Sequence, residues 1–160
     1  MTRKGDADRM RAVSLAGRAY RAAFREDWPA ANAVMAEIGR QSPNVIALVL
    51  VAWCDTALAG QRQAAGMPEL EDGKPAGELV QLVWADEEAG RWHADADAVP
   101  PAARWAGRLL AARAALDLEA FQALLRAMPA DGHERGAYGI AVLMNCVKST
   151  ARPDPEEAAS

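Results

Sequence analysis

The sequence AGRAYRAAFREDWPAANAVMAEI, residues 16–38, is similar in its residue pattern to AGRLLAARAALDLEAFQALLRAM, residues 106–128, which lies 90 residues later. Seven of the 23 aligned positions are identical, among them Asp27 and Asp117. In an alanine-rich chain the shared pattern says more than the identities, because the apolar residues behind each aspartate recur at helical spacing. We therefore expect two related three-helix units, residues 8–58 and 101–149, packed as a bundle or as a short helical array.

The first unit divides into three predicted helices. Asp27 is typical of an N-cap and would begin the second helix, residues 28–38, while Ser42 before Pro43 begins a third that runs to about residue 58. The first helix covers about residues 8–25. Five of its residues recur at alternating spacings of three and four and so share one apolar face: Met10, Val13, Gly17, Tyr20 and Phe24.

The most apolar run of the chain is VIALVLVAWC, residues 45–54. A bilayer requires about 20 such residues, and this run ends after ten, at Asp55. The sequence therefore predicts a core helix and no association with a membrane.

The middle of the chain, residues 59–100, is expected to hold a linker and a bridging helix. Four glycines and two prolines between residues 60 and 77 predict a mobile linker, which a helix over about residues 78–89 and a loop would follow. The second unit has helices beginning after Pro101, Asp117 and Asp131, and the tail, residues 150–160, is expected to be flexible.

One segment of the second unit resembles a known family. AALDLEAFQALLRAMP, residues 114–129, is similar to the second helix of a tetratricopeptide repeat, with Ala120, Leu124 and Ala127 at that family's small, large, small spacing. The resemblance covers about 15 residues and implies an antiparallel helical pair. It departs in the preceding helix, where Trp105 and Gly107 are out of phase by about one residue.

Composition indicates a single all-α domain of six or seven helices. Alanine, the strongest helix former, supplies 38 of the 160 residues, and arginine supplies 15 of the 18 basic ones, a bias typical of a GC-rich genome such as that of an actinobacterium or a phage. Two widely separated cysteines and an N-terminus without an apolar signal segment predict a reduced, cytoplasmic protein.

The sequence offers no catalytic constellation and no cofactor motif. A phosphate-binding glycine loop, a dinucleotide fingerprint and a serine nucleophile elbow are all missing from the 160 residues. Cys54 and Cys146 lie in runs of aliphatic residues, where a thiol is inert. The simplest interpretation of His133 is that it lies in the first turn of a helix. We therefore expect no enzyme, no catalytic residue and no cofactor. One alternative is a small metal protein or enzyme that uses His93, Asp95 and Asp97 as ligands on one extended segment.

Charge is distributed unevenly along a chain of net charge −4. Residues 1–25 carry seven basic and two acidic side chains, whereas residues 67–97 carry nine acidic and two basic ones. The first helix therefore presents a basic flank beside its apolar face, and aromatic residues next to the acidic run add possible anchoring points. The candidate partner-binding residues are Arg11, Arg18, Arg21, Arg25, Trp84 and Trp92.

These features favour a non-enzymatic protein-interaction module, an adaptor or regulator with an acidic protein partner. The simplest alternative is that the basic helix faces the acidic middle of its own chain, and the apolar face of that helix also leaves a homodimer open. A nucleic-acid-associated regulator using the arginine stripe is disfavoured by the net acidity.

Overall fold

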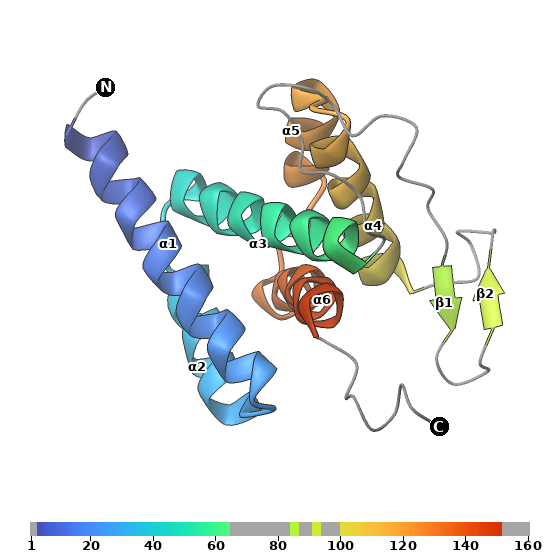
Figure 1. Ribbon diagram of the computed structural model, residues 1–160. Helices are drawn as coiled ribbons and strands as arrows, with labels where there is room; N and C mark the ends of the chain where they lie inside the picture. The colour runs from blue at the N-terminus through green and yellow to red at the C-terminus, as the bar shows by residue number, and fades with distance from the viewer. Residues whose placement is uncertain (1–2, 65–83, 87–90, 94–99, 152–160) are drawn as a thin grey trace.

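The computed structural model describes residues 3–64, 84–86, 91–93 and 100–151, and Figure 1 shows their arrangement. These residues form six helices and one antiparallel hairpin of two short strands, so the packed body is all-α as predicted. The helices are α1 (Arg3–Phe24), α2 (Trp28–Gly39), α3 (Pro43–Ala64), α4 (Pro101–Ala114), α5 (Leu118–Arg126) and α6 (Gly132–Thr150), and the strands are β1 (Trp84–Asp86) and β2 (Arg91–His93).

The helices form a bundle around a central pair, α3 and α6, which share the most extensive contact (Figure 1). On one side α1 packs against both central helices, and on the other side α4 does the same. The short helices complete each half, because α2 packs on α1 and α6 while α5 packs on α4. The first half of the bundle consists of α1, α2 and α3, and the second of α4, α5 and α6. In each half the first helix packs on the short helix that follows it and on both central helices.

The core is apolar throughout the described residues, and it holds no buried charged or polar side chain. Its largest fully buried side chains include Leu15, Leu50, Leu109 and Leu143, one from each of the four long helices. Residues 43–62 of α3 are long and apolar enough to cross a membrane by length and composition alone. Here that helix is packed by α1, α4 and α6, which agrees with the predicted core helix.

The turns that follow α1 and α4 have the same geometry at positions 90 residues apart. Glu26 and Leu116 both adopt a left-handed backbone, with φ of 59° and 54°. The next residues, Asp27 and Asp117, cap the following helices by accepting hydrogen bonds from the amides of Ala30 and Ala120 at 3.1 and 3.0 Å. Both aspartate N-caps were expected from the sequence, and the shared left-handed residue was not.

The left-handed turn residue Leu116 carries a conformational cost that can be removed. A side chain at positive φ costs about 1–2 kcal/mol, whereas glycine adopts this region freely and loses about 0.5–1 kcal/mol through its larger unfolded-state entropy. Leu116 is also exposed. We expect Leu116→Gly to raise the free energy of unfolding by about 0.5–1 kcal/mol in urea titrations. Ala115→Gly is the matched control, because Ala115 has φ of −78° and should gain nothing.

The apolar face predicted for the first helix is wrong for three of its five residues, whereas Gly17 and Tyr20 are half-buried and Tyr20 packs against the core. The structure buries five residues of α1 that lie on a different face, Ala12, Leu15, Ala16, Ala19 and Ala23. Met10, Val13 and Phe24 are 75%, 62% and 51% exposed instead. Four of the five buried residues are alanines, which are small enough to bring α1 close to α3 and α6, and Leu15 is the one large side chain among them. In the second unit Leu116 and Leu118 are also exposed.

The middle segment departs from the prediction where the structure describes it. A helix was expected over residues 78–89, but Trp84–Asp86 form strand β1 and pair with Arg91–His93. The linker was expected from residue 60, but α3 continues to Ala64. The remainder of the predicted linker and bridging helix, residues 65–83 and 87–90, and the tail, residues 152–160, lie outside the described residues.

Candidate interaction surface

The outward side of α1 presents large apolar side chains to solvent. Met10, Val13 and Phe24 lie at steps of 3 and 11 residues, which on an α-helix share one side. Phe24 packs beside Tyr20 with ring centroids 5.8 Å apart, and the Tyr20 hydroxyl is 2.7 Å from Thr150 Oγ1 of α6. Fourteen residues at 1.5 Å per residue separate Met10 from Phe24, so this apolar strip is about 21 Å long.

The arginines of α1 divide into two groups. Arg18 pairs with Glu37 of α2 at 3.0 Å, and Arg11 donates a hydrogen bond to the Gln41 side chain. These two therefore hold α1 to α2 and to the turn after it. Most of the acidic middle, residues 67–97, lies outside the described residues, so the alternative that it faces the basic helix stays a prediction. Arg21 and Arg25 are exposed, and within the described part of the chain their side chains have no ion-pair partner.

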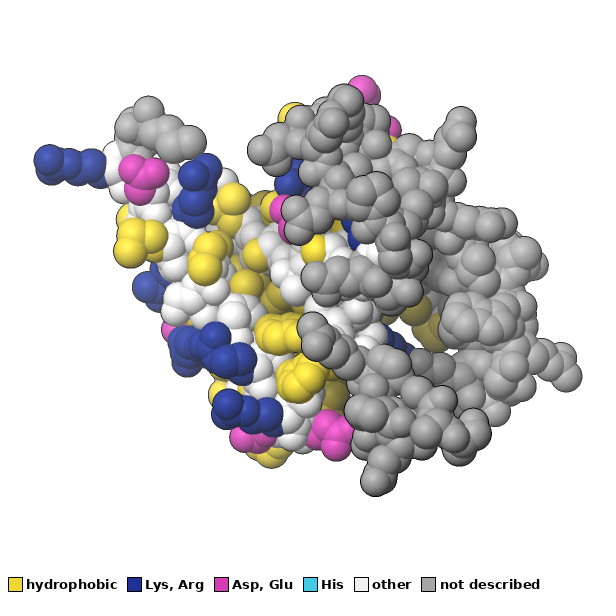
Figure 2. Space-filling model, in the orientation of Figure 1, with side chains coloured by type: hydrophobic (Ala, Val, Ile, Leu, Met, Phe, Trp, Pro, Cys, Tyr) yellow, Lys and Arg dark blue, Asp and Glu magenta, His cyan; other side chains and the backbone are white. Residues whose placement is uncertain are grey.

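The free arginines border the apolar strip. Figure 2 shows basic side chains beside apolar ones along α1. A Cβ added at Gly17 would lie 3.1 Å from Nη1 of Arg21, which places this guanidinium along the helix surface over Gly17. We call the combination of Met10, Val13, Arg21, Phe24 and Arg25 the outer face of α1. Arg21 and Arg25 from the predicted partner-binding set thus lie on this face, together with apolar residues that were expected to be buried.

The other predicted site residues belong to the hairpin or its surroundings. The backbones of Trp84 and Trp92 lie on adjacent strands, with Trp84 opposite His93 and Ala85 opposite Trp92. Asp95 and Asp97 lie outside the described residues. Among the side chains that the structure describes, no three potential ligands gather into a metal site. The metal hypothesis for His93, Asp95 and Asp97 therefore stays a prediction.

Both cysteine thiols are buried between the central helices. Cys54 of α3 and Cys146 of α6 are 0% and 1% exposed and form no disulfide. Burial, with a smaller contribution from the charge of Asp55, raises the pKa of Cys54 to about 12, and burial raises the pKa of Cys146 to about 11. Because a thiolate is the reactive form, these thiols are inert near neutral pH, as expected from their aliphatic surroundings.

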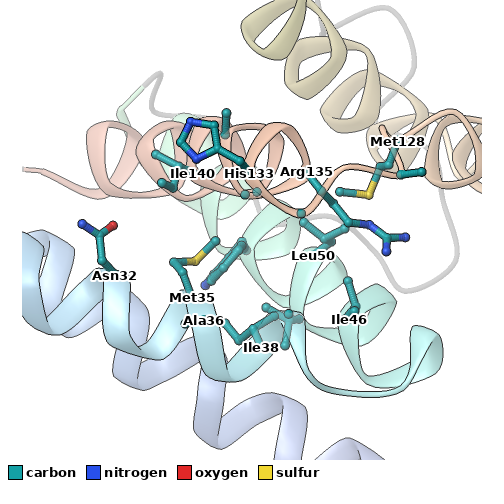
Figure 3. Close-up of a pocket in the computed structure, with 18 residues that line it drawn as sticks. Asn32, Met35, Ala36, Ile38, Ile46, Leu50, Met128, His133, Arg135 and Ile140 are labelled. Carbon is teal, nitrogen blue, oxygen red and sulfur yellow. The ribbon is translucent and has the colours of Figure 1, made fainter.

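A groove between α2, α3 and α6 is a second candidate site, and sequence reasoning missed it. Its volume is about 890 Å³, and Figure 3 shows side chains of the three helices converging on it. The floor is apolar and buried, with Ile38, Leu50 and Trp53, and the rim holds exposed Arg135 and His133. The glycines of α6 at 132, 136 and 139, which share one side of the helix and all line the groove, are the signal that could have indicated it.

Comparison with protein-family models, with curated proteins and with solved structures gives no significant match. The function must therefore be argued from the geometry of this chain itself.

Proposed function

We propose that this protein is a non-enzymatic interaction module, an adaptor or regulator, that binds an acidic amphipathic segment of another protein through the outer face of α1. Exposed Met10, Val13 and Phe24 carry this proposal, because they are large apolar side chains on a helix whose opposite side is fully packed. Large apolar side chains exposed on one side of a helix and bordered by charge are characteristic of interaction sites.

The charge around the strip favours an acidic partner. Arg21 and Arg25 present guanidinium groups that pair bidentately with carboxylates, and residues 1–25 carry five more basic than acidic side chains. Two copies of the outer face would bring like charges together, which costs affinity. The apolar strip in turn favours a protein over a nucleic acid, because phosphate recognition does not need exposed methionine or phenylalanine.

The sharpest test uses a charge reversal that spares the internal contacts of α1. Arg21→Glu combined with Arg25→Glu changes the outer face and leaves the Arg18–Glu37 pair in place. We expect this double variant to lose at least about tenfold in partner affinity, because it replaces attraction by repulsion at the rim of the interface. Arg108→Glu with Arg126→Glu on α4 and α5 is the matched control, with the same net charge and an unchanged α1.

The partner can be located by placing a photo-crosslinking residue, p-benzoylphenylalanine, at Val13. The proposal predicts a crosslink in cell extract to an acidic segment of a different protein, found by mass spectrometry, that the double variant abolishes and the control retains. A crosslink between two copies of this chain, a product that nuclease removes, or equal yields from the double variant and the control would each contradict it.

We also propose that the two halves of the bundle arose by duplication of one three-helix unit. The left-handed residues Glu26 and Leu116, the aspartate caps that follow them and the equivalent neighbours of α1 and α4 support this proposal. On this view the N-terminal turns of α1, which have no counterpart in the shorter α4, are an addition to the first unit. They carry Met10, and the other two residues of the strip, Val13 and Phe24, align with alanines in α4, so the strip would distinguish the two halves.

A further inference from the structure

The groove between α2, α3 and α6 has the size and lining of a small-molecule site. Ligand pockets typically have volumes of about 300–1,000 Å³ and mostly apolar walls with a few polar groups. This groove measures about 890 Å³, and its accessible apolar lining includes half-buried Ile46 and Ile140, in addition to the buried side chains of the core beneath. Half-buried Met35 and Met128 stand at its sides, and methionine adapts its shape readily to an apolar ligand.

The charge of the lining selects an anion. None of the 18 residues that line the groove is acidic, whereas Arg135 is cationic and His133 and Asn32 add side-chain nitrogen atoms. Arg135 is exposed, and no described side chain pairs with it. Figure 3 shows it extending from α6 near Met128, at one end of the groove. One guanidinium balances one negative charge, and its planar fork matches a carboxylate.

The beginning of α6 does not supply this anion site. Asp131 caps the helix and accepts hydrogen bonds from the amides of His133 and Glu134 at 2.9 and 3.1 Å, so these amides are already satisfied. A carboxylate in the groove would therefore depend on the Arg135 side chain, which makes its contribution separable by mutation.

The dimensions of the lining limit the length of the ligand. The lining residues of α6 run from Gly132 to Ile140, a rise of about 12 Å at 1.5 Å per residue, and those of α3 from Ile46 to Trp53 rise about 10 Å. We propose that the groove binds a single-chain carboxylate of medium length, a fatty-acid anion, with its carboxylate on Arg135 and its chain along the half-buried apolar lining, Met35, Ile46, Met128 and Ile140.

Calorimetric titration with sodium decanoate tests this assignment on the full chain. We expect saturable binding of one decanoate per chain. Arg135→Gln should weaken decanoate binding by about tenfold or more, because it removes the charged hydrogen bonds, and should leave the weaker binding of decanol unchanged. Arg126→Gln is the matched control, because Arg126 is exposed on α5 and does not line the groove, and it should not change decanoate binding. Decyltrimethylammonium, which has the same chain and a positive head, should not bind.

A second variant tests the position of the acyl chain. A Cβ added at Gly136 meets no atom within 4 Å, so the side chain of Gly136→Leu begins in open space at the lining of the groove. Since leucine also favours the helix, the variant should fold with unchanged or higher Tm while losing both decanoate and decanol.

Three results would overturn the assignment. The first is the absence of saturable decanoate binding to the wild-type chain. The second is equal decanoate affinity in the wild type, Arg135→Gln and Gly136→Leu. The third is a wild-type dimer that Gly136→Leu converts to monomer, because the groove would then be covered by a second copy of the chain.

Discussion

Trp53→Ala is expected to lower the free energy of unfolding by about 3–5 kcal/mol, the range for removal of a large aromatic side chain from a core. Trp53 is 2% exposed on α3, and its indole Nε1 donates a hydrogen bond to the carbonyl oxygen of Ala16 in α1 at 3.1 Å. The truncation therefore removes both the filling of the space between two helices and a directional contact between them. Urea titration followed by circular dichroism measures the loss.

Trp53→Phe separates the two contributions. Phenylalanine keeps most of the aromatic bulk and removes the N–H donor, so the variant should cost about 1–2 kcal/mol, the sum of one hydrogen bond and a small cavity. A loss of less than 1 kcal/mol for Trp53→Ala would contradict the packing of α1 on α3. Equal losses for the two variants would mean that the hydrogen bond, and not the volume, holds the helices together.

Gly60→Ala should be destabilising by about 2 kcal/mol or more, although alanine normally favours a helix over glycine by about 1 kcal/mol. A Cβ at Gly60 would lie 2.3 Å from the carbonyl oxygen and 2.8 Å from the carbonyl carbon of Ser149. These atoms belong to the backbone of α6 and cannot rotate away. The substitution must therefore separate the ends of α3 and α6, the two central helices.

Gly17→Ala is the matched control for Gly60→Ala. Both glycines lie inside long helices, but the closest atoms to a Cβ at Gly17 belong to the flexible end of Arg21, at 3.1 Å. This control should therefore stabilise the protein by about 0.5–1 kcal/mol. The two substitutions should shift Tm in opposite directions, and stabilisation by both would contradict the close approach of α3 and α6.

The sequence predicted the helix starts well because they depend on local chemistry. Asp27, Asp117 and Asp131 each cap a helix, as their positions before helical patterns indicated. The all-α fold class could also be predicted, since the alanine content and the apolar spacing both favour helices. The burial of α1 was not accessible in the same way, because the sequence provides two apolar faces. The rule that large apolar residues lie inside selected the one with Met10 and Val13, which the structure exposes.

The remaining differences come from tertiary structure. Strand β1 depends on pairing with β2, and three residues such as Trp84–Asp86 carry too little periodicity to distinguish a strand from a helix. The groove depends on how closely α2 approaches α6, where a Cβ on Gly139 would lie 2.9 Å from the terminal methyl of Met35. The sequence shows the spacing of these glycines and not the helix that they face.

The alanine-lined inner side of α1 has a thermodynamic consequence. Alanines such as Ala12, Ala19 and Ala23 lose no rotamer entropy on burial. Each of them removes little apolar area from water, so their burial contributes little hydrophobic stabilisation to the packing of α1. A partner that covered Met10, Val13 and Phe24 would bury larger side chains than the four alanines that, with Leu15, attach α1 to its own fold. Because such a partner binds only the folded chain, its binding energy would add to the stability of the bundle. Partner binding would therefore be detected as slower hydrogen exchange of the backbone amides of α1.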